Sequence, residues 1–134
     1  MLRDLILKSI RYSFYCIGTH YAIVFSIMLY IYLYLYRNTI VLIITLALSI
    51  LMVIASILAD RRNIVQFINV LNLVGIRRRV LLVITIVFIY IRSLFIIIAY
   101  SIGALYNSIM VFLALFTHLT LIFILSLIIK SGVL

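Results

Sequence analysis

Long runs without charged residues constrain the fold of this chain more than any other feature. Residues 12–36 and 38–59 contain no Asp, Glu, Lys or Arg, and Arg92 alone interrupts residues 80–129. A helix that crosses a bilayer needs about 20 apolar residues, each adding roughly 1.5 Å of length. Each of the first two runs is long enough for one such helix, and the third is long enough for two.

The third run must contain a turn, and its least apolar stretch lies between Gly103 and Ser108. Gly, Asn and Ser are residues that favour turns. Because 69% of the residues are apolar and 10% are charged, we expect an all-α, polytopic membrane protein with a single transmembrane domain over residues 1–134. The four predicted spans are 15–36, 40–59, 80–102 and 107–129.

The basic residues predict the orientation of these spans, because Lys and Arg collect in cytoplasmic loops. If the N-terminus is cytoplasmic, only Arg37 faces the outside. The basic residues then on the cytoplasmic side are Arg3, Lys8, Arg11, Arg61, Arg62, Arg77, Arg78, Arg79 and Lys130. We therefore expect both termini in the cytoplasm of a cell that carries the protein in its plasma membrane. Topology and contact with anionic lipid account for the net charge of +9, and no soluble region is large enough to bind nucleic acid.

Two amphipathic segments lie outside the predicted spans. Residues 1–14 are predicted to form an interfacial helix, and residues 61–75 a cytoplasmic helix between the second and third spans. Gly75 stands where a helix ends in a left-handed residue. The second segment either rests on the bilayer or docks on a soluble partner, and its uncharged amides slightly favour a protein. The residues expected to contribute to such a contact are Arg62, Gln66, Phe67, Asn69, Leu71, Asn72 and Gly75.

Arg92 falls near the middle of the third predicted span. At about 1.5 Å per residue, it lies roughly 20 Å along the helix from Arg79 in the basic cluster. An arginine at this depth is unfavourable by about 2.5–3.5 kcal/mol unless it is paired. The only acids, Asp4 and Asp60, are expected outside the bundle. Two interpretations of Arg92 stay open. It hydrogen-bonds to Tyr hydroxyls and backbone carbonyls or snorkels, or it forms an ion pair with another subunit or contacts an anion.

His20 and His118 also fall near mid-depth of their predicted spans. A neutral imidazole hydrogen-bonded to Thr19, Thr117 or Thr120 is favoured over ligation of a metal or haem. The sequence has no carboxylate pair, no cluster of metal ligands and no nucleophile beside a base. We therefore expect no enzyme activity, no catalytic residue, no bound cofactor and no metal site.

The order of these elements resembles the permease domain of FtsX/MacB-type ABC transporters. In that family a coupling helix of the type R-E-I-x-x-L-x-x-L-G-A-x-R-R leads into the third span. The positions of this chain that match it, within QFINVLNLVGIRRR, are Ile68, Leu71, Val74, Gly75, Arg78 and Arg79. Phe67 replaces the usual Glu, the large extracellular domain between the first two spans is missing, and the third span lacks the usual glycines.

The resemblance implies a minimal permease subunit that oligomerises with other membrane subunits and works with an ABC ATPase in trans. Residues 61–75 would be the coupling helix that receives motion from the ATPase. Two alternatives stay open. One is a small accessory or haem-bearing subunit of an electron-transfer complex, with His20 and His118 as axial ligands and Arg92 near a propionate. The other is a structural membrane scaffold.

Overall fold

The computed structural model describes residues 2–131, and these residues form helices and no strands. The helices, in chain order, are α1 (Leu2–Tyr15), α2 (Ile17–Leu35), α3 (Thr39–Ala59), α4 (Arg61–Leu73), α5 (Arg78–Gly103) and α6 (Ser108–Lys130). Four of them, α2, α3, α5 and α6, are long and apolar enough to cross a membrane. The predicted all-α fold class is confirmed, and the protein is a multi-pass membrane protein.

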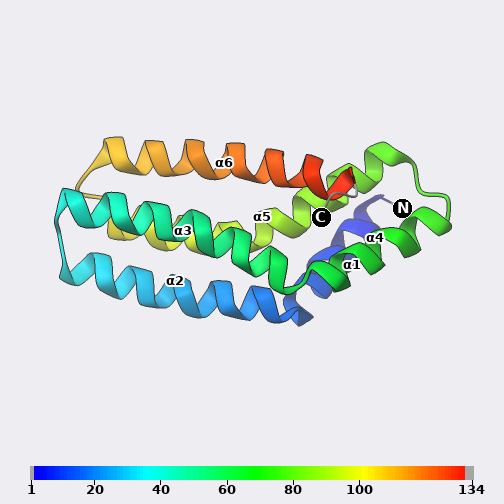
Figure 1. Ribbon diagram of the computed structural model, residues 1–134, viewed down its shortest axis with the longest axis horizontal. Helices are drawn as coiled ribbons and strands as arrows, with labels where there is room; N and C mark the ends of the chain where they lie inside the picture. Colours follow the sequence, from blue (N-terminus) through cyan, green and yellow to red (C-terminus); the bar gives the residue numbers. More distant parts are fainter. Residues whose placement is uncertain (1, 132–134) are drawn as a thin grey trace.

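The four long helices run side by side along the long axis of the molecule, and α1 and α4 extend from one end of this bundle (Figure 1). We call this the basic end; it holds α1, α4, the start of α5 and the last turn of α6. The opposite end, called the loop end, holds the two short connections at residues 36–38 and 104–107. Both chain termini lie toward the basic end (Figure 1).

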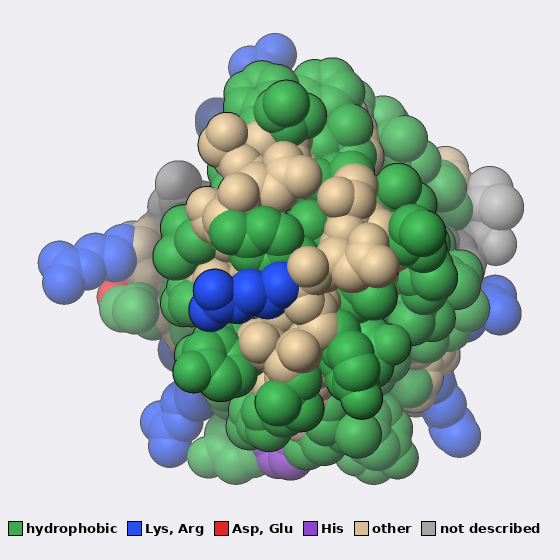
Figure 2. All heavy atoms as spheres, turned by 90° about the vertical axis from the view of Figure 1, so that its left-hand side faces the viewer, with side chains coloured by type: hydrophobic (Ala, Val, Ile, Leu, Met, Phe, Trp, Pro, Cys, Tyr) green, Lys and Arg blue, Asp and Glu red, His purple; other side chains and the backbone are tan. Residues whose placement is uncertain are grey.

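Side-chain caps begin the two helices that follow the short connections. The Asn38 side chain accepts a hydrogen bond from Ile40 N at 3.1 Å, and the Asn107 side chain accepts one from Met110 N at 3.3 Å. Each cap satisfies a backbone N–H that the first helical turn leaves unpaired. These caps allow tight reversals at the loop end, whose surface is mostly apolar with a basic side chain lying across it (Figure 2).

Gly75 produces the sharp corner between α4 and α5 that the sequence predicts. Its φ of 79° is positive, a conformation that other residues adopt only with strain. Ile76 N donates to Leu71 O at 3.3 Å and Gly75 N donates to Asn72 O, which resembles a Schellman end. The helix ends at Leu73, slightly before the predicted bound at residue 75.

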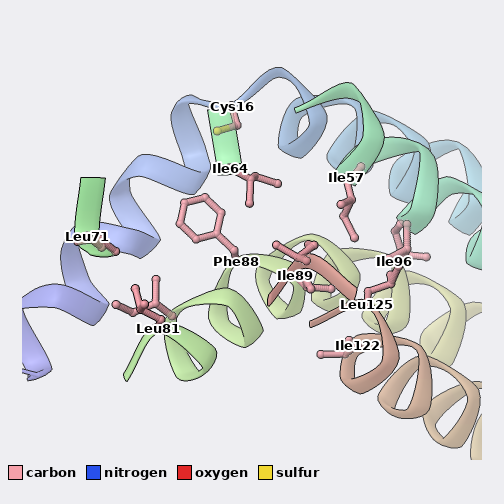
Figure 3. Packing of buried hydrophobic residues seen from close by; sticks show 14 residues of the cluster. Cys16, Ile57, Ile64, Leu71, Leu81, Phe88, Ile89, Ile96, Ile122 and Leu125 are labelled. Atoms are coloured by element: carbon pink, nitrogen blue, oxygen red, sulfur yellow. The ribbon is translucent and has the colours of Figure 1, made fainter. Parts of the chain in front are cut away.

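The apolar face of α4 packs against other helices of the protein. Ile64 and Leu71 are buried, and Ile64 points toward the ring of Phe88 in α5 (Figure 3). The ring of Phe67 stacks on Tyr12 of α1 with centroids 4.9 Å apart, and lies 5.3 Å from Phe88. Most of this apolar face is therefore covered by α1 and α5, whereas Val74 at its end is 73% exposed.

Candidate functional site

Asp60 and Arg92 form a buried ion pair where α3 ends and α4 begins. Arg92 Nη2 lies 2.8 Å from Asp60 Oδ2, and the two side chains are 0% and 2% exposed. The expectation that Asp60 stands outside the bundle is wrong, and Arg92 needs no partner from another subunit. The reason is that the first turns of α5 extend beyond the end of α3, alongside α1 and α4 (Figure 1). Arg92 therefore lies level with the last turn of α3.

The pair has further partners in two spans. Arg92 Nη1 donates to Ser56 O of α3 at 2.8 Å, which agrees with the carbonyl contact that the sequence suggested. Gly18 N, in the first turn of α2, donates to Asp60 Oδ2 at 2.7 Å. Arg92 Nη2 is at ion-pair distance without hydrogen-bond geometry, and Arg92 Nε has no hydrogen-bond partner within residues 2–131. The Asp60 carboxylate thus links α2, α3 and α5.

Gly18 allows this approach, and sequence reasoning missed it. A Cβ at this position would overlap Ser56 O and Asp60 Oδ2, so a larger residue would push α2 away from α3. Gly18 is the only glycine in the first predicted span. A lone glycine in an apolar helix often marks a close backbone approach, and this signal could have located it.

His118 is buried between α6 and α3 and uses both ring nitrogens. Nδ1 donates to Ala114 O at 2.8 Å, and Nε2 lies 3.2 Å from the hydroxyl of Ser49. A hydroxyl partner was expected, but the three threonines proposed for this role bond to backbone carbonyls instead. His20 is exposed on α2, so the two histidines do not form a shared site.

A groove of about 850 Å³ opens at the basic end between α4, the start of α5 and the end of α6. Among its lining residues, Arg62, Gln66, Asn69 and Asn72 belong to the contact surface predicted from the sequence. Phe67 and Leu71, which were predicted with them, point instead into the core. The seven predicted residues therefore divide between a polar groove, an apolar packing face and the corner at Gly75.

The far end of α4 carries an exposed apolar tip, and of its three residues the coupling-helix motif includes only Val74. Val70, Leu73 and Val74 are 57%, 87% and 73% exposed. Tyr12 of α1 stacks on Phe67, on the packed side of α4. Burial raises the pKa of the Tyr12 hydroxyl, and nearby Cys16 and Asp60 raise this pKa further. The tip is thus the exposed apolar part of α4, and the exposed polar part lines the groove.

Comparison with known proteins identifies no relative. No protein-family model, curated protein or solved structure matches this chain.

Proposed function

We propose that this chain is a transmembrane relay subunit of an ABC-type complex, with both termini in the cytoplasm. A cytoplasmic ATPase docks on α4, and α4 passes the motion to the spans. The observation that carries the proposal is the position of Asp60, which ends α3, precedes α4 and is bound by Arg92 of α5 and Gly18 of α2. A displacement of the start of α4 therefore acts on three spans.

The packing of α4 supports a rigid relay. Its apolar face is fixed to α1 and α5 by ring contacts: Phe67 stacks on Tyr12 and lies tilted against Phe88, and Tyr12 meets Phe88 edge-on. Aromatic contacts of this kind contribute about 0.5–1.5 kcal/mol each beyond the area they bury. A helix attached in this way moves together with its neighbours, whereas a helix held only by lipid would absorb the motion.

The exposed tip of α4 is the proposed docking surface. Val70, Leu73 and Val74 stand next to one another on one end of the helix and contribute nothing to the core. Exposed apolar residues rimmed by polar ones are typical of protein contacts. The basic end carries nearly all of the Lys and Arg residues, which supports its cytoplasmic orientation.

The test of docking is Leu73→Asp, because Leu73 is 87% exposed and we expect the fold to tolerate its replacement. A carboxylate buried at the contact is expected to weaken association by about 2 kcal/mol or more. The matched control is Leu7→Asp, which places the same charge at a 53% exposed leucine of α1. The ATPase is measured by co-purification from native membranes. Equal association for Leu73→Asp and the wild type would exclude docking at the tip.

The relay requires a separate variant that leaves the tip intact. Asp60→Asn keeps the side-chain shape and removes the charge that Arg92 binds. We expect the ATPase to remain bound while its stimulation by this subunit falls. If Asp60→Asn does not fold, Gly18→Ala tests the same junction from α2. Full stimulation of ATP hydrolysis in a folded junction variant would contradict the relay.

No observation favours the haem-bearing alternative. Both ring nitrogens of His118 already have partners, and His20 lies on the exposed face of a different helix.

A further inference from the structure

The groove at the basic end has a strongly asymmetric charge. Its rim includes the exposed side chains of Arg62 and Arg78, and no acidic residue lines it. Neither of these two arginines forms an ion pair with another described residue. The nearby Asp60 carboxylate is turned toward Arg92 and Gly18. Among the described residues, no acidic side chain therefore neutralises the charges of Arg62 and Arg78.

Neutral hydrogen-bond donors stand beside these arginines. Gln66, Asn69 and Asn72 line the groove along α4, and each amide group offers two N–H donors. Arg78 is also the first residue of α5, where the positive end of a helix adds to the attraction for an anion. Guanidinium groups bind phosphate with paired, parallel hydrogen bonds. The rim is thus suited to a phosphate group.

Apolar side chains form the floor of the groove. Leu81 lies in the first turn of α5 and Ile129 in the last turn of α6, and both line the groove. Val65 and Ile68 of α4 line it as well. An acyl chain in the groove therefore contacts apolar side chains of α4, α5 and α6.

We propose that the groove binds one anionic phospholipid, with its anionic headgroup at the basic rim and an acyl chain over Leu81 and Ile129. The pairing of a basic rim with an apolar floor favours a lipid over an acidic peptide, which would leave the floor without an apolar partner. Basic pockets between spans bind anionic headgroups by the same combination. This site is independent of ATPase docking, because the exposed tip of α4 does not line the groove.

The experiment is native mass spectrometry of the full chain in detergent, titrated with dioleoyl phosphatidylglycerol or dioleoyl phosphatidylcholine. The two lipids share acyl chains, so a difference in affinity reports the headgroup. We expect the first phosphatidylglycerol to bind at least about tenfold more tightly. The groove variant is Arg62→Gln with Arg78→Gln, and the control is Arg3→Gln with Arg11→Gln, which removes the same charge from exposed positions of α1.

We expect the groove variant to lose the preference for phosphatidylglycerol and the control to keep it, with both retaining wild-type helicity. Equal losses in the two variants would show diffuse attraction to positive charge and would overturn the proposal. Displacement of the bound lipid by millimolar inorganic phosphate or by a polyglutamate peptide would assign the groove to a soluble anion instead, and would also overturn it. Equal affinity of the wild type for the two lipids would have the same consequence.

Discussion

The two halves of the bundle bury similar apolar side chains, but different polar groups join their helices. Toward the basic end, an ion pair between Asp60 and Arg92 connects the helices. The Asp60 carboxylate also accepts a hydrogen bond from Gly18 N. Toward the loop end and at the middle of the bundle, the polar contacts are neutral: Tyr100 donates to Leu42 O at 2.9 Å, and His118 contacts Ser49 near the centres of α6 and α3. Removing one partner of a buried ion pair leaves an unpaired charge in a low dielectric and strongly destabilises the protein, whereas removing one neutral hydrogen bond has a smaller effect.

Removing one charge of the Asp60–Arg92 pair is expected to have the largest effect. Asp60→Ala leaves a buried arginine without a counter-ion, and we expect a loss of about 3–5 kcal/mol in the free energy of unfolding. Unfolding in mixed SDS micelles, followed by circular dichroism, measures it. The combined variant Asp60→Ala with Arg92→Leu should recover much of the loss, because no charge remains buried. Losses that simply add would contradict a coupled pair.

One glycine in each half of the bundle, Gly18 or Gly103, tests how closely the helices pack there. Gly18→Ala places a methyl group against the backbone carbonyl of Ser56, which cannot move aside without shifting α3. In Gly103→Ala, the added Cβ would lie 2.8 Å from the Cβ of Leu33. We expect Gly18→Ala to destabilise the protein by about 1–3 kcal/mol and Gly103→Ala by less, in the same unfolding assay. The reverse order would mean that the basic half packs more loosely than its contacts indicate.

The next prediction concerns the hydrogen bond between α3 and α6. Ser49→Ala removes the hydroxyl that contacts His118 Nε2 at 3.2 Å. Hydrogen bonds between membrane helices contribute about 0.6 kcal/mol on average and about 1.7 kcal/mol at most, so we expect a loss in this range. Ser126→Ala is the control, since that hydroxyl bonds within α6 to Phe123 O. An equal loss in both variants would remove the role assigned to the interhelical bond.

The elements of the fold were predictable from the sequence because they depend on local pattern. Uncharged runs set the four long helices, and Gly75 marked the corner that its positive φ now explains. The amphipathic pattern of residues 61–75 placed Ile64, Phe67, Ile68, Leu71 and Val74 on one face; Ile64 and Leu71 are buried, whereas Val74 is 73% exposed. What covers that face was not predictable, since Tyr12 and Phe88 reach it from distant parts of the chain.

The candidate site was harder to predict because it depends on how far α5 extends past α3. Counting residues from the basic cluster placed Arg92 at mid-depth, which assumed that every span begins at the same level. Instead, the first turns of α5 lie beside α1 and α4, and this brings Arg92 level with Asp60. The groove likewise arises only when α4, α5 and α6 come together. Both the ion pair and the groove depend on how the helices are shifted along their axes relative to one another, and a single sequence does not reveal this shift.

The smallest expected effect is at Tyr100, whose hydroxyl donates to Leu42 O at 2.9 Å. Because Leu42 lies inside α3, its carbonyl oxygen is also placed to accept a helical backbone bond, so Tyr100→Phe leaves no acceptor wholly unpaired. We expect a loss near the average of about 0.6 kcal/mol for a bond between membrane helices. Tyr100 and Ser49 share no hydrogen-bond partner, so Tyr100→Phe and Ser49→Ala should be additive. Additive losses here and non-additive losses at Asp60 and Arg92 would together establish that the basic half acts as one unit. Strong coupling between Tyr100 and Ser49 would instead give both halves the same cooperativity, and the contrast between them would fail.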